Sequence, residues 1–454
     1  MFPLYLFPWR MNKINFISLP YNWIKCKLLD IGIIISGGTP STKDKSNFGG
    51  DIPWITPADL SEYNEKYIVY GKRNITENGL QNSSAHLIPK GSILFSSRAP
   101  IGYVVIAANS LSTNQGFKNI IPSKYINGEY LYQYLNTCKQ KAEKIASGTT
   151  FKEISAEKFG NLPFPLPPLP EQHRIVAKID SLFSELDNGV AFLKTIKTQL
   201  AIYRQAVLQW AFEGFSIDKE ATLSSVVTDL FDGPFGSNLK TSDYKLSGVR
   251  VIRLENVKSL MFNNEKKSFV SKAKYKLLKK NTVCFPDIII STFISNEVKT
   301  CILPPHIGYA INKADCVCIR TNDEILSKFL MYYLSSKKVY NNLFQQVHGA
   351  TRPRINTTQI KRIPVPICPK PEQLAIVSAI ESRLFVCDKL EQTIDQTLAL
   401  SASLRQSILK KAFEGRLVPQ DPNDEPAEKL LERIKAEKAA VLAKQKQTRK
   451  RGRR

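Results

Sequence analysis

The sequence contains one arrangement of residues that could do catalytic chemistry. Asp287 is followed by Glu297 and Lys299. Two carboxylates can hold a magnesium ion and a lysine can support the attacking water, so this order suits a metal-dependent nuclease. Short patterns of this kind also arise by chance. The corresponding stretch of the first half, GSILFSSRAPIGYVVI from Gly91, contains no acidic residue, which favours chance variation, and the nuclease remains an alternative.

Other catalytic motifs are missing from the sequence. It has no P-loop, no dinucleotide or methyl-donor glycine fingerprint, and no adenine methyltransferase motif of the Asn/Asp-Pro-Pro-aromatic type. The four histidines lack the spacing of a metal or acid-base site, and the eight cysteines include no CxxC pair. We therefore expect no metal, no cofactor and no catalytic residue in this chain. The scattered cysteines indicate reduced thiols in a cytoplasmic protein.

The charge of the chain points to a polyanionic partner. Its formal net charge is +24 and its pI is about 9.6. A balance this basic suits nucleic acid or an anionic membrane surface. We expect no membrane span, because no segment reaches the roughly 18 uninterrupted apolar residues that a bilayer requires. Much of the excess charge lies after Lys429, in a run that is typical of a solvated chain end.

An internal repeat decides the architecture. RQAVLQWAFEG begins at Arg204 and RQSILKKAFEG begins at Arg405. Residues 147–187 align with residues 348–388 without a gap, and the match continues to the two AFEG endings. An ungapped match of this length indicates a helix, because one inserted residue would rotate every later side chain by about 100 degrees.

Each repeat carries a narrow heptad seam. Apolar residues from Val176 to Ala211, and from Val377 to Ala412, alternate steps of three and four. We expect two rods of roughly 60 Å, starting near Pro170 and Pro371 and pairing as an antiparallel coiled coil. Arg204 and Arg405 fall on the seam, where either they fix the register between the helices or they are solvated arginines near a helix end.

The predicted fold class is α+β, with two globular α/β domains, two long paired helices and approximate two-fold symmetry. Each globular region should contain a hairpin of apolar strands and a closing helix, at residues 129–148 and 327–349. The predicted boundaries are a possible disordered extension at 1–17, domain 1 at 18–165, helical spacer 1 at 166–215, domain 2 at 216–366, helical spacer 2 at 367–418 and a basic helical tail at 419–454.

These features resemble the specificity subunit of type I restriction-modification systems. The resemblance covers residues 19–440 and rests on GGTPS, GGDIPWI, SSRAPIG, STNQGFK, LPPLPEQHRIVAKID, the two AFEG endings and EGRLVPQDPNDEPAEKLLERI, in that order. It implies that each recognition domain reads one half of a split double-stranded DNA target. It also implies that the helices dock two methyltransferase subunits, which restriction subunits join. S-adenosylmethionine, ATP and magnesium would then belong to those partners. The alternative from another class is a standalone DNA-binding regulator.

Candidate DNA contacts come from residue types that hydrogen-bond phosphates or base edges. Several could instead close turns or bond to backbone, and that alternative stays open. In domain 1 the candidates are Thr39, Ser41, Ser96, Ser97, Arg98, Asn114 and Gln115. In domain 2 they are Ser237, Asn238, Lys240, Thr292, Ser295, Arg352 and Arg354.

The AFEG endings are candidates for docking. We expect Phe212 and Phe413 to be buried against a partner subunit or against the opposite helix, with Glu213 and Glu414 at the edge of that contact. The alternative is a hydrophobic contact at the end of the rod itself.

Overall fold

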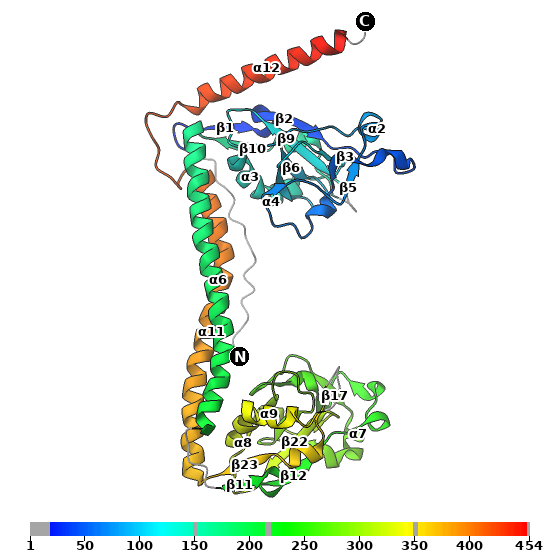
Figure 1. Ribbon diagram of the computed structural model, residues 1–454, viewed down its shortest axis with the longest axis vertical. Helices are drawn as coiled ribbons and strands as arrows, with labels where there is room; N and C mark the ends of the chain where they lie inside the picture. Colours follow the sequence, from blue (N-terminus) through cyan, green and yellow to red (C-terminus); the bar gives the residue numbers. More distant parts are fainter. Residues whose placement is uncertain (1–18, 149–151, 214–218, 348–352, 452–454) are drawn as a thin grey trace. The chain divides into compact units, whose positions relative to one another are not determined.

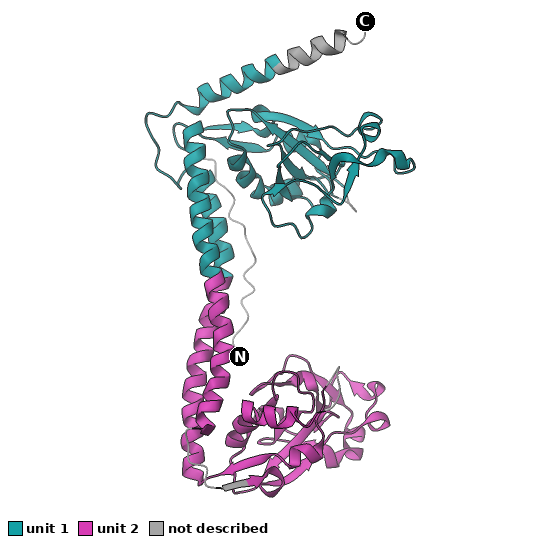
Figure 2. Cartoon of the chain, in the orientation of Figure 1, with its two compact units in different colours: residues 1–190, 399–454 teal, residues 191–398 magenta. Residues whose placement is uncertain are grey.

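The structure is a computed structural model that describes residues 19–148, 152–213, 219–347 and 353–451. The chain divides into two compact units, residues 1–190 with 399–454 and residues 191–398 (Figure 2). Each unit contains one recognition domain and one stretch of each long helix. No helix in the described ranges is both long enough and apolar enough to cross a membrane.

Two sheets form the body of domain 1 (Figure 1). The larger has the order β2-β9-β6-β7-β4 and the smaller has the order β5-β3-β8. Their strands are β2 (Gly32–Ser36), β3 (Phe48–Ile55), β4 (Tyr67–Ile68), β5 (Arg73–Ile75), β6 (Ile93–Ser96), β7 (Val104–Ala107), β8 (Ser112–Thr113) and β9 (Phe117–Pro122). The predicted hairpin of apolar strands is confirmed as the antiparallel pair β6 and β7, every residue of which is buried.

Domain 2 also has two sheets, of order β12-β22-β19-β20 and β13-β17-β14-β21-β18. Their strands are β12 (Val227–Phe231), β13 (Tyr244–Lys245), β14 (Val249–Ile252), β17 (Ser268–Val270), β18 (Thr282–Val283), β19 (Ile288–Ser291), β20 (Thr300–Ile302), β21 (Ala310–Asn312) and β22 (Cys316–Thr321). The predicted second hairpin is the antiparallel pair β19 and β20.

Each predicted closing helix is interrupted, so both expectations of one continuous helix were wrong. In domain 1 the segment forms α3 (Gly128–Asn136) and α4 (Lys139–Ile145), and in domain 2 it forms α8 (Ser327–Leu334) and α9 (Lys337–Phe344). The break in domain 2 has a local cause. Ser336 adopts an extended conformation and its side chain accepts a hydrogen bond from Val339 N, which starts a new helix.

The two long helices are α6 (Leu169–Glu213) and α11 (Lys370–Phe413). A two-stranded sheet precedes the start of each: β1 (Ile24–Lys27) pairs with β10 (Pro163–Leu166), and β11 (Lys219–Thr222) pairs with β23 (Pro364–Ile367). Short helices complete the domains, among them α1 (Leu28–Ile31), α2 (Glu77–Gln81), α5 (Ala156–Gly160), α7 (Lys272–Leu277) and α10 (Thr357–Lys361). The chain finishes with α12 (Ala427–Arg451).

The helices pair antiparallel within each unit, as the heptads predict. In the second unit Leu200 packs with Cys387 and Ile394. In the first, Val176 and Ile179 share a core cluster with Ile408. Each long helix has a proline at its second position. Gln172 in α6 and Gln373 in α11 then fix the start of the helix. Gln172 accepts from Asn127 N at 2.8 Å, and Gln373 accepts from Leu326 N at 2.8 Å, so each side chain ties its helix to the preceding domain.

Candidate nucleic-acid interface

One edge of domain 1 is built from a glycine loop and a tight turn. Gly37 N donates to Phe117 O at 3.2 Å and Gly38 N donates to Thr113 O at 2.9 Å. A Cβ atom on Gly37 would lie 1.8 Å from Asn114 O, so only glycine allows this approach. The loop therefore places the residues after it beside the turn that precedes β9.

This edge brings three of the candidate residues together. Thr39 Oγ1 donates to Gln115 Oε1, and Gln115 is exposed. Asn114 Oδ1 accepts a hydrogen bond from Gly116 N at 2.9 Å, so Asn114 closes the turn, which was the alternative to a DNA contact. Its side chain is half-exposed. Ser41 is exposed a short way along the glycine loop. Hydroxyl and amide groups held at an edge in this way can donate to and accept from DNA base edges.

Two candidates at the hairpin turn were wrong. Ser96 is fully buried; its Oγ donates to Pro100 O at 2.8 Å and accepts from Tyr103 N at 2.7 Å, which shapes the turn. Ser97 is also fully buried. Neither hydroxyl is accessible to DNA. Arg98 is accessible, with about a third of its side chain exposed and Nη1 3.6 Å from Glu153 Oε2.

Domain 2 repeats this edge with different side chains. Asn114 N donates to Ile55 O at 2.9 Å in domain 1, and Lys313 N donates to Ile252 O at 2.9 Å in domain 2. The sheet registers agree, since Ile93 pairs with Ile120 and Ile288 pairs with Ile319. Lys313 therefore occupies the position of Asn114.

The glycine loop is repeated as well. A Cβ atom on Gly233 would lie 2.1 Å from Lys313 C, so Gly233 takes the place of Gly37. Two residues later, Phe235 takes the place of Thr39, and 57% of Phe235 is exposed. Ser237, Asn238 and Lys240 follow it in the loop and are all exposed.

The remaining domain 2 candidates divide into accessible and buried ones. Thr292 is 4% exposed and donates to Asp315 Oδ1 at 3.2 Å, so its assignment as a DNA contact was wrong. Ser295 is exposed, and its Oγ donates to Asn296 Oδ1 at 2.9 Å. Arg354 is exposed, and its Cζ atom lies 4.3 Å from the centre of the Phe293 ring. Arg352 lies outside the described residues.

Sequence reasoning missed Lys313, Arg253 and Phe235 on this edge. Arg253 follows β14, as Thr56 follows β3 in domain 1: Arg253 N donates to Asn256 Oδ1 at 3.0 Å and Thr56 N donates to Asp59 Oδ2 at 2.8 Å. The two domains share too little sequence to align, so only the backbone hydrogen bonds reveal these equivalences.

The alternative nuclease site is not assembled. Asp287 precedes β19 and Glu297 lies beyond its other end, so the four strand residues between them separate the carboxylates by roughly 13 Å. Asp287 is 3% exposed and accepts a bidentate pair of hydrogen bonds from Arg320, at 2.9 and 2.8 Å. In the part of the chain that the structure describes, no group of three His, Cys, Asp or Glu residues could hold a metal ion. Asp287 is a partner of Arg320 inside the domain.

The seam arginines join the two long helices to each other. Arg204 Nη2 lies 2.7 Å from Asp388 Oδ1 and 3.0 Å from Glu391 Oε2, within the second unit. Arg405 pairs with Asp187 within the first unit. Both contacts run from one helix to the other, which fits the register-fixing role predicted from the seam.

The AFEG phenylalanines are buried within their own units, in core clusters that include residues of the opposite long helix and of a domain helix. Phe413 is fully buried between Tyr130 and Tyr134 of α3, with ring centroids 5.3 and 5.2 Å apart. Phe212 is 5% exposed and packs on Phe329 and Tyr333 of α8, at 5.4 and 5.1 Å. Each ring is already enclosed by a recognition-domain helix of its own unit, so neither ring is free to dock a partner subunit.

The carboxylates after these rings differ. Glu213 is exposed and accepts from Gln209 Nε2 at 2.9 Å, whereas Glu414 is 4% exposed and pairs with Arg416. Glu213 thus stands at an accessible edge, and Glu414 does not.

Comparison with known proteins identifies the family. The model of the type I restriction modification DNA specificity domain matches residues 20–200 and 228–400. The chain belongs to the family of type I restriction-modification specificity subunits. Two matches to one model agree with the internal repeat.

Individual specificity subunits match to different extents. The MjaIX specificity subunit of Methanocaldococcus jannaschii is 43% identical over 206 residues, covering 45% of this chain and 46% of that protein. The EcoBI specificity subunit of Escherichia coli is 24% identical over 469 residues, covering 95% of each chain. The HsdS subunit from Thermoanaerobacter tengcongensis, a solved structure, is 18% identical, with a TM-score of 0.57 over 88% of this chain and 98% of that one.

A C-terminal segment completes the first unit of this specificity subunit. Asp424 binds Arg174 of α6, with a shortest distance of 2.6 Å, and Gln420 Nε2 donates to Glu171 Oε1 at 2.7 Å. Trp23 Nε1 donates to the other oxygen of Glu171 at 2.9 Å. Ala427, Leu430, Leu431 and Ile434 of α12 belong to the core cluster of domain 1. Residues 420–434, here called the strap, are therefore part of this unit's core.

Proposed function

We propose that this chain directs a type I restriction-modification complex to a bipartite, asymmetric DNA target, each domain reading one half. The observation that carries the proposal is the repeated edge, in which equivalent backbone positions present different side chains. Thr39 and Asn114 in domain 1 correspond to Phe235 and Lys313 in domain 2. A shared backbone with unlike side chains suits two readers of unlike half-sites.

The helices supply the spacing and the chain supplies no catalysis. Two readers on paired helices should bind half-sites separated by unread base pairs, about one helical turn apart if both enter the same face of DNA. Lengthening both helices by one heptad should lengthen that gap. Methylation and cleavage then depend on methyltransferase and restriction subunits, which would carry S-adenosylmethionine, ATP and magnesium.

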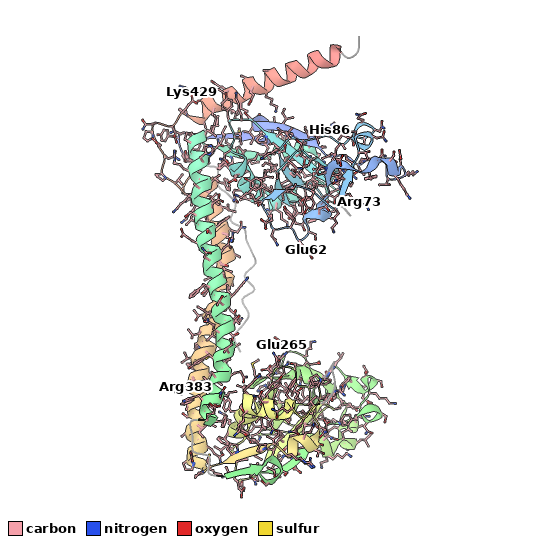
Figure 3. All side chains as sticks on the ribbon, in the orientation of Figure 1. Glu62, Arg73, His86, Glu265, Arg383 and Lys429 are labelled. Atoms are coloured by element: carbon pink, nitrogen blue, oxygen red, sulfur yellow. The ribbon has the colours of Figure 1, made fainter. Side chains whose placement is uncertain are left out.

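Methyltransferase docking is better explained by one edge of the helix pair than by the AFEG rings. In the second unit this edge carries exposed Tyr203, Trp210 and Leu390. Arg383 of α11, labelled in Figure 3, has its Cζ atom 4.0 Å from the centre of the Trp210 ring. On the opposite edge Asp388 binds Arg204, and Leu208 is fully buried in the core cluster of domain 2. Exposed aromatic and aliphatic residues on a helix pair are typical of a protein interface.

Copurification and methylation mapping test the function. The full chain should copurify with methyltransferase subunits, and the assembly should methylate adenines in one two-part sequence. A chain that binds its site tightly alone, without those subunits, would instead be a standalone regulator. Sequence-independent methylation by the assembly would overturn the proposal.

A paired substitution tests the dock. Changing Tyr203 and Leu390 to Asp should abolish copurification with the methyltransferase while the chain stays folded. Ala201→Asp, on the opposite edge of α6, is the matched control and should leave copurification unchanged. Equal loss with both variants would show that the apolar edge is not the dock.

A further inference from the structure

Two cations of domain 2 share one aromatic ring. Arg253 Cζ lies 5.4 Å and Lys313 Nζ lies 5.6 Å from the centre of the Tyr244 ring. Cations at these distances are attracted to the ring, so Tyr244 holds both side chains in place. The arrangement joins three separate segments: Tyr244 lies on β13, Arg253 follows β14 and Lys313 follows β21.

The positive charge of this group is only partly compensated. Arg253 Nε lies 3.5 Å from Glu255 Oε1, an ion pair about a third exposed on each side. Among the residues that the structure describes, Lys313 makes no ion pair, and it is half-exposed. Two cations held near one ring repel each other unless an anion lies between or beside them, so the group is suited to an external anion.

The group lies on the edge that the two domains share. Arg253 occupies the position of Thr56 and Lys313 occupies the position of Asn114. The backbone of Lys313 also packs against Gly233, which begins the loop that exposes Phe235. Domain 2 therefore presents cations at the two turns where domain 1 presents a hydroxyl and an amide.

We propose that Arg253 and Lys313, positioned by Tyr244, bind backbone phosphates of the DNA half-site read by domain 2. This rests on the proposed function and adds a specific consequence. At this edge domain 2 gains affinity by neutralising phosphates, whereas domain 1 has neutral groups suited to base edges. The affinity contributed by domain 2 then depends on salt, because each phosphate contact releases counterions.

Salt titration of the full chain, assembled with its methyltransferase subunits, tests the proposal. The probe is a DNA duplex that carries the target found by methylation mapping. Arg253→Gln and Lys313→Gln should each reduce the slope of log affinity against log salt by about 0.9, equivalent to about a threefold smaller loss of affinity between 50 and 200 mM salt. The double variant should lose about twice that slope.

Two further variants provide controls. Lys361→Gln removes one exposed cation from the end of α10, next to β23 and away from the edge, and should leave the slope unchanged. Tyr244→Phe keeps the ring and should also leave it unchanged. If Arg253→Gln and Lys313→Gln lower only the melting temperature and keep the wild-type slope, the pair is an internal contact and the proposal is overturned.

The same experiment separates this inference from the function on which it rests. A wild-type assembly without sequence preference would overturn the proposed function. Slopes measured on a duplex of unrelated sequence would still decide whether the two cations bind phosphate, because that contact does not depend on base sequence.

Discussion

Phe413 and Phe212 end the two repeated helices and occupy matching aromatic sites, yet the residues around these sites differ. Glu414 is buried beside Phe413, whereas Glu213 is exposed beside Phe212. The difference continues along the chain. After Phe413 the chain returns over the first unit as the strap, which binds the start of α6; after Phe212 it enters domain 2.

This contrast separates what the repeat encodes from what one copy adds. The repeat encodes the helix, its seam and an aromatic ring that packs on a domain helix of its own unit. The strap adds a second anchor at the start of α6 and is specific to the first unit. Glu171 shows the effect: it is 1% exposed between Trp23 and Gln420, while its counterpart Glu372 is half-exposed.

Removal of the strap should have the largest effect, because it should destabilise the first unit and leave the second unit unchanged. Truncation after Arg416 deletes the buried residues Leu430, Leu431 and Ile434, and burial of each such side chain contributes about 1.5 to 3 kcal/mol. The sum is a large part of the 5 to 15 kcal/mol that stabilises a typical domain. Hydrogen exchange should show lost protection in the first unit and native protection in the second.

A shorter deletion is the control for that truncation. Ending the chain after Ala440 removes much of the basic tail and keeps the residues that pack in the core. It should leave hydrogen exchange unchanged in both units. Equal loss of protection in both units after the longer truncation would contradict a strap that serves the first unit alone.

The two phenylalanines should each stabilise only their own unit. Phe413→Ala and Phe212→Ala should each cost about 3 to 5 kcal/mol, because both rings are enclosed by aromatic side chains. Denaturant unfolding followed by hydrogen exchange assigns the loss to a unit. Phe192→Ala, at a ring that is 66% exposed, should change little.

A Phe212→Ala chain that keeps wild-type stability but no longer copurifies with the methyltransferase would instead support docking through the AFEG rings.

The ion pair between Asp287 and Arg320 in domain 2 offers the next test. Domain 1 has Ser92 and Ile121 at the positions of Asp287 and Arg320, as the matching registers show. Asp287→Ala should cost about 1.5 to 3 kcal/mol, because it removes two charge-assisted hydrogen bonds from Arg320, which is partly exposed and keeps its ion pair with Asp229. Glu297→Ala, at a half-exposed side chain, should have a small effect on the denaturation midpoint.

The same variants test the nuclease alternative. The wild-type chain alone should not cleave DNA when magnesium is added. Magnesium-dependent cleavage that Asp287→Ala abolishes, without a change in stability, would contradict the structural role of this carboxylate.

The sequence best predicted the elements in which apolar residues recur at a regular spacing. The seams, the pairing of the two long helices and both hairpins follow from apolar spacing, which depends on local geometry. The duplication also argued against the nuclease alternative, because Asp287 has no acidic counterpart in domain 1. It also identified Arg204 and Arg405, whose partners lie on the opposite helix.

The elements that sequence could not predict depend on contacts between distant segments. In the sequence Ser96 has the features of an exposed loop residue. In the structure the turn bends back, so that the Ser96 hydroxyl donates to Pro100 O and accepts from Tyr103 N. Lys313 has no motif around it, and its role emerges only from the hydrogen bond to Ile252. Phe212 and Phe413, at the ends of α6 and α11, looked available for docking because nothing local shows that α8 and α3 enclose them.

Gln115 tests whether the domain 1 edge reads bases. Gln115→Ala should relax the sequence preference at one position of one half-site by about 1 to 3 kcal/mol, without changing the salt slope. Methylation mapping measures the preference. Ser96→Ala is the matched control, because its buried hydroxyl should affect stability and leave the preferred sequence unchanged.

The smallest expected effect is a dependence on pH that arises at Glu171, one of the two repeated glutamates. Burial raises the pKa of Glu171 above its ordinary value of 4.5, while the hydrogen bond from Trp23 and the charge of Arg174 oppose the rise. A carboxyl group with a raised pKa favours folding when protonated, so this contribution is present below pH 4.5 and is lost as pH rises through the raised pKa. Glu171→Gln should therefore flatten the stability of the first unit above pH 4.5.

Unfolding of each unit, followed by hydrogen exchange across that pH range, measures the effect. Glu372→Gln makes the same change at the start of α11, where the carboxylate is half-exposed, and is the matched control. If both substitutions alter their units equally, the repeated sequence itself is responsible. A change confined to Glu171→Gln would show that the strap, by removing this carboxylate from water, gives the two copies of one motif different electrostatics.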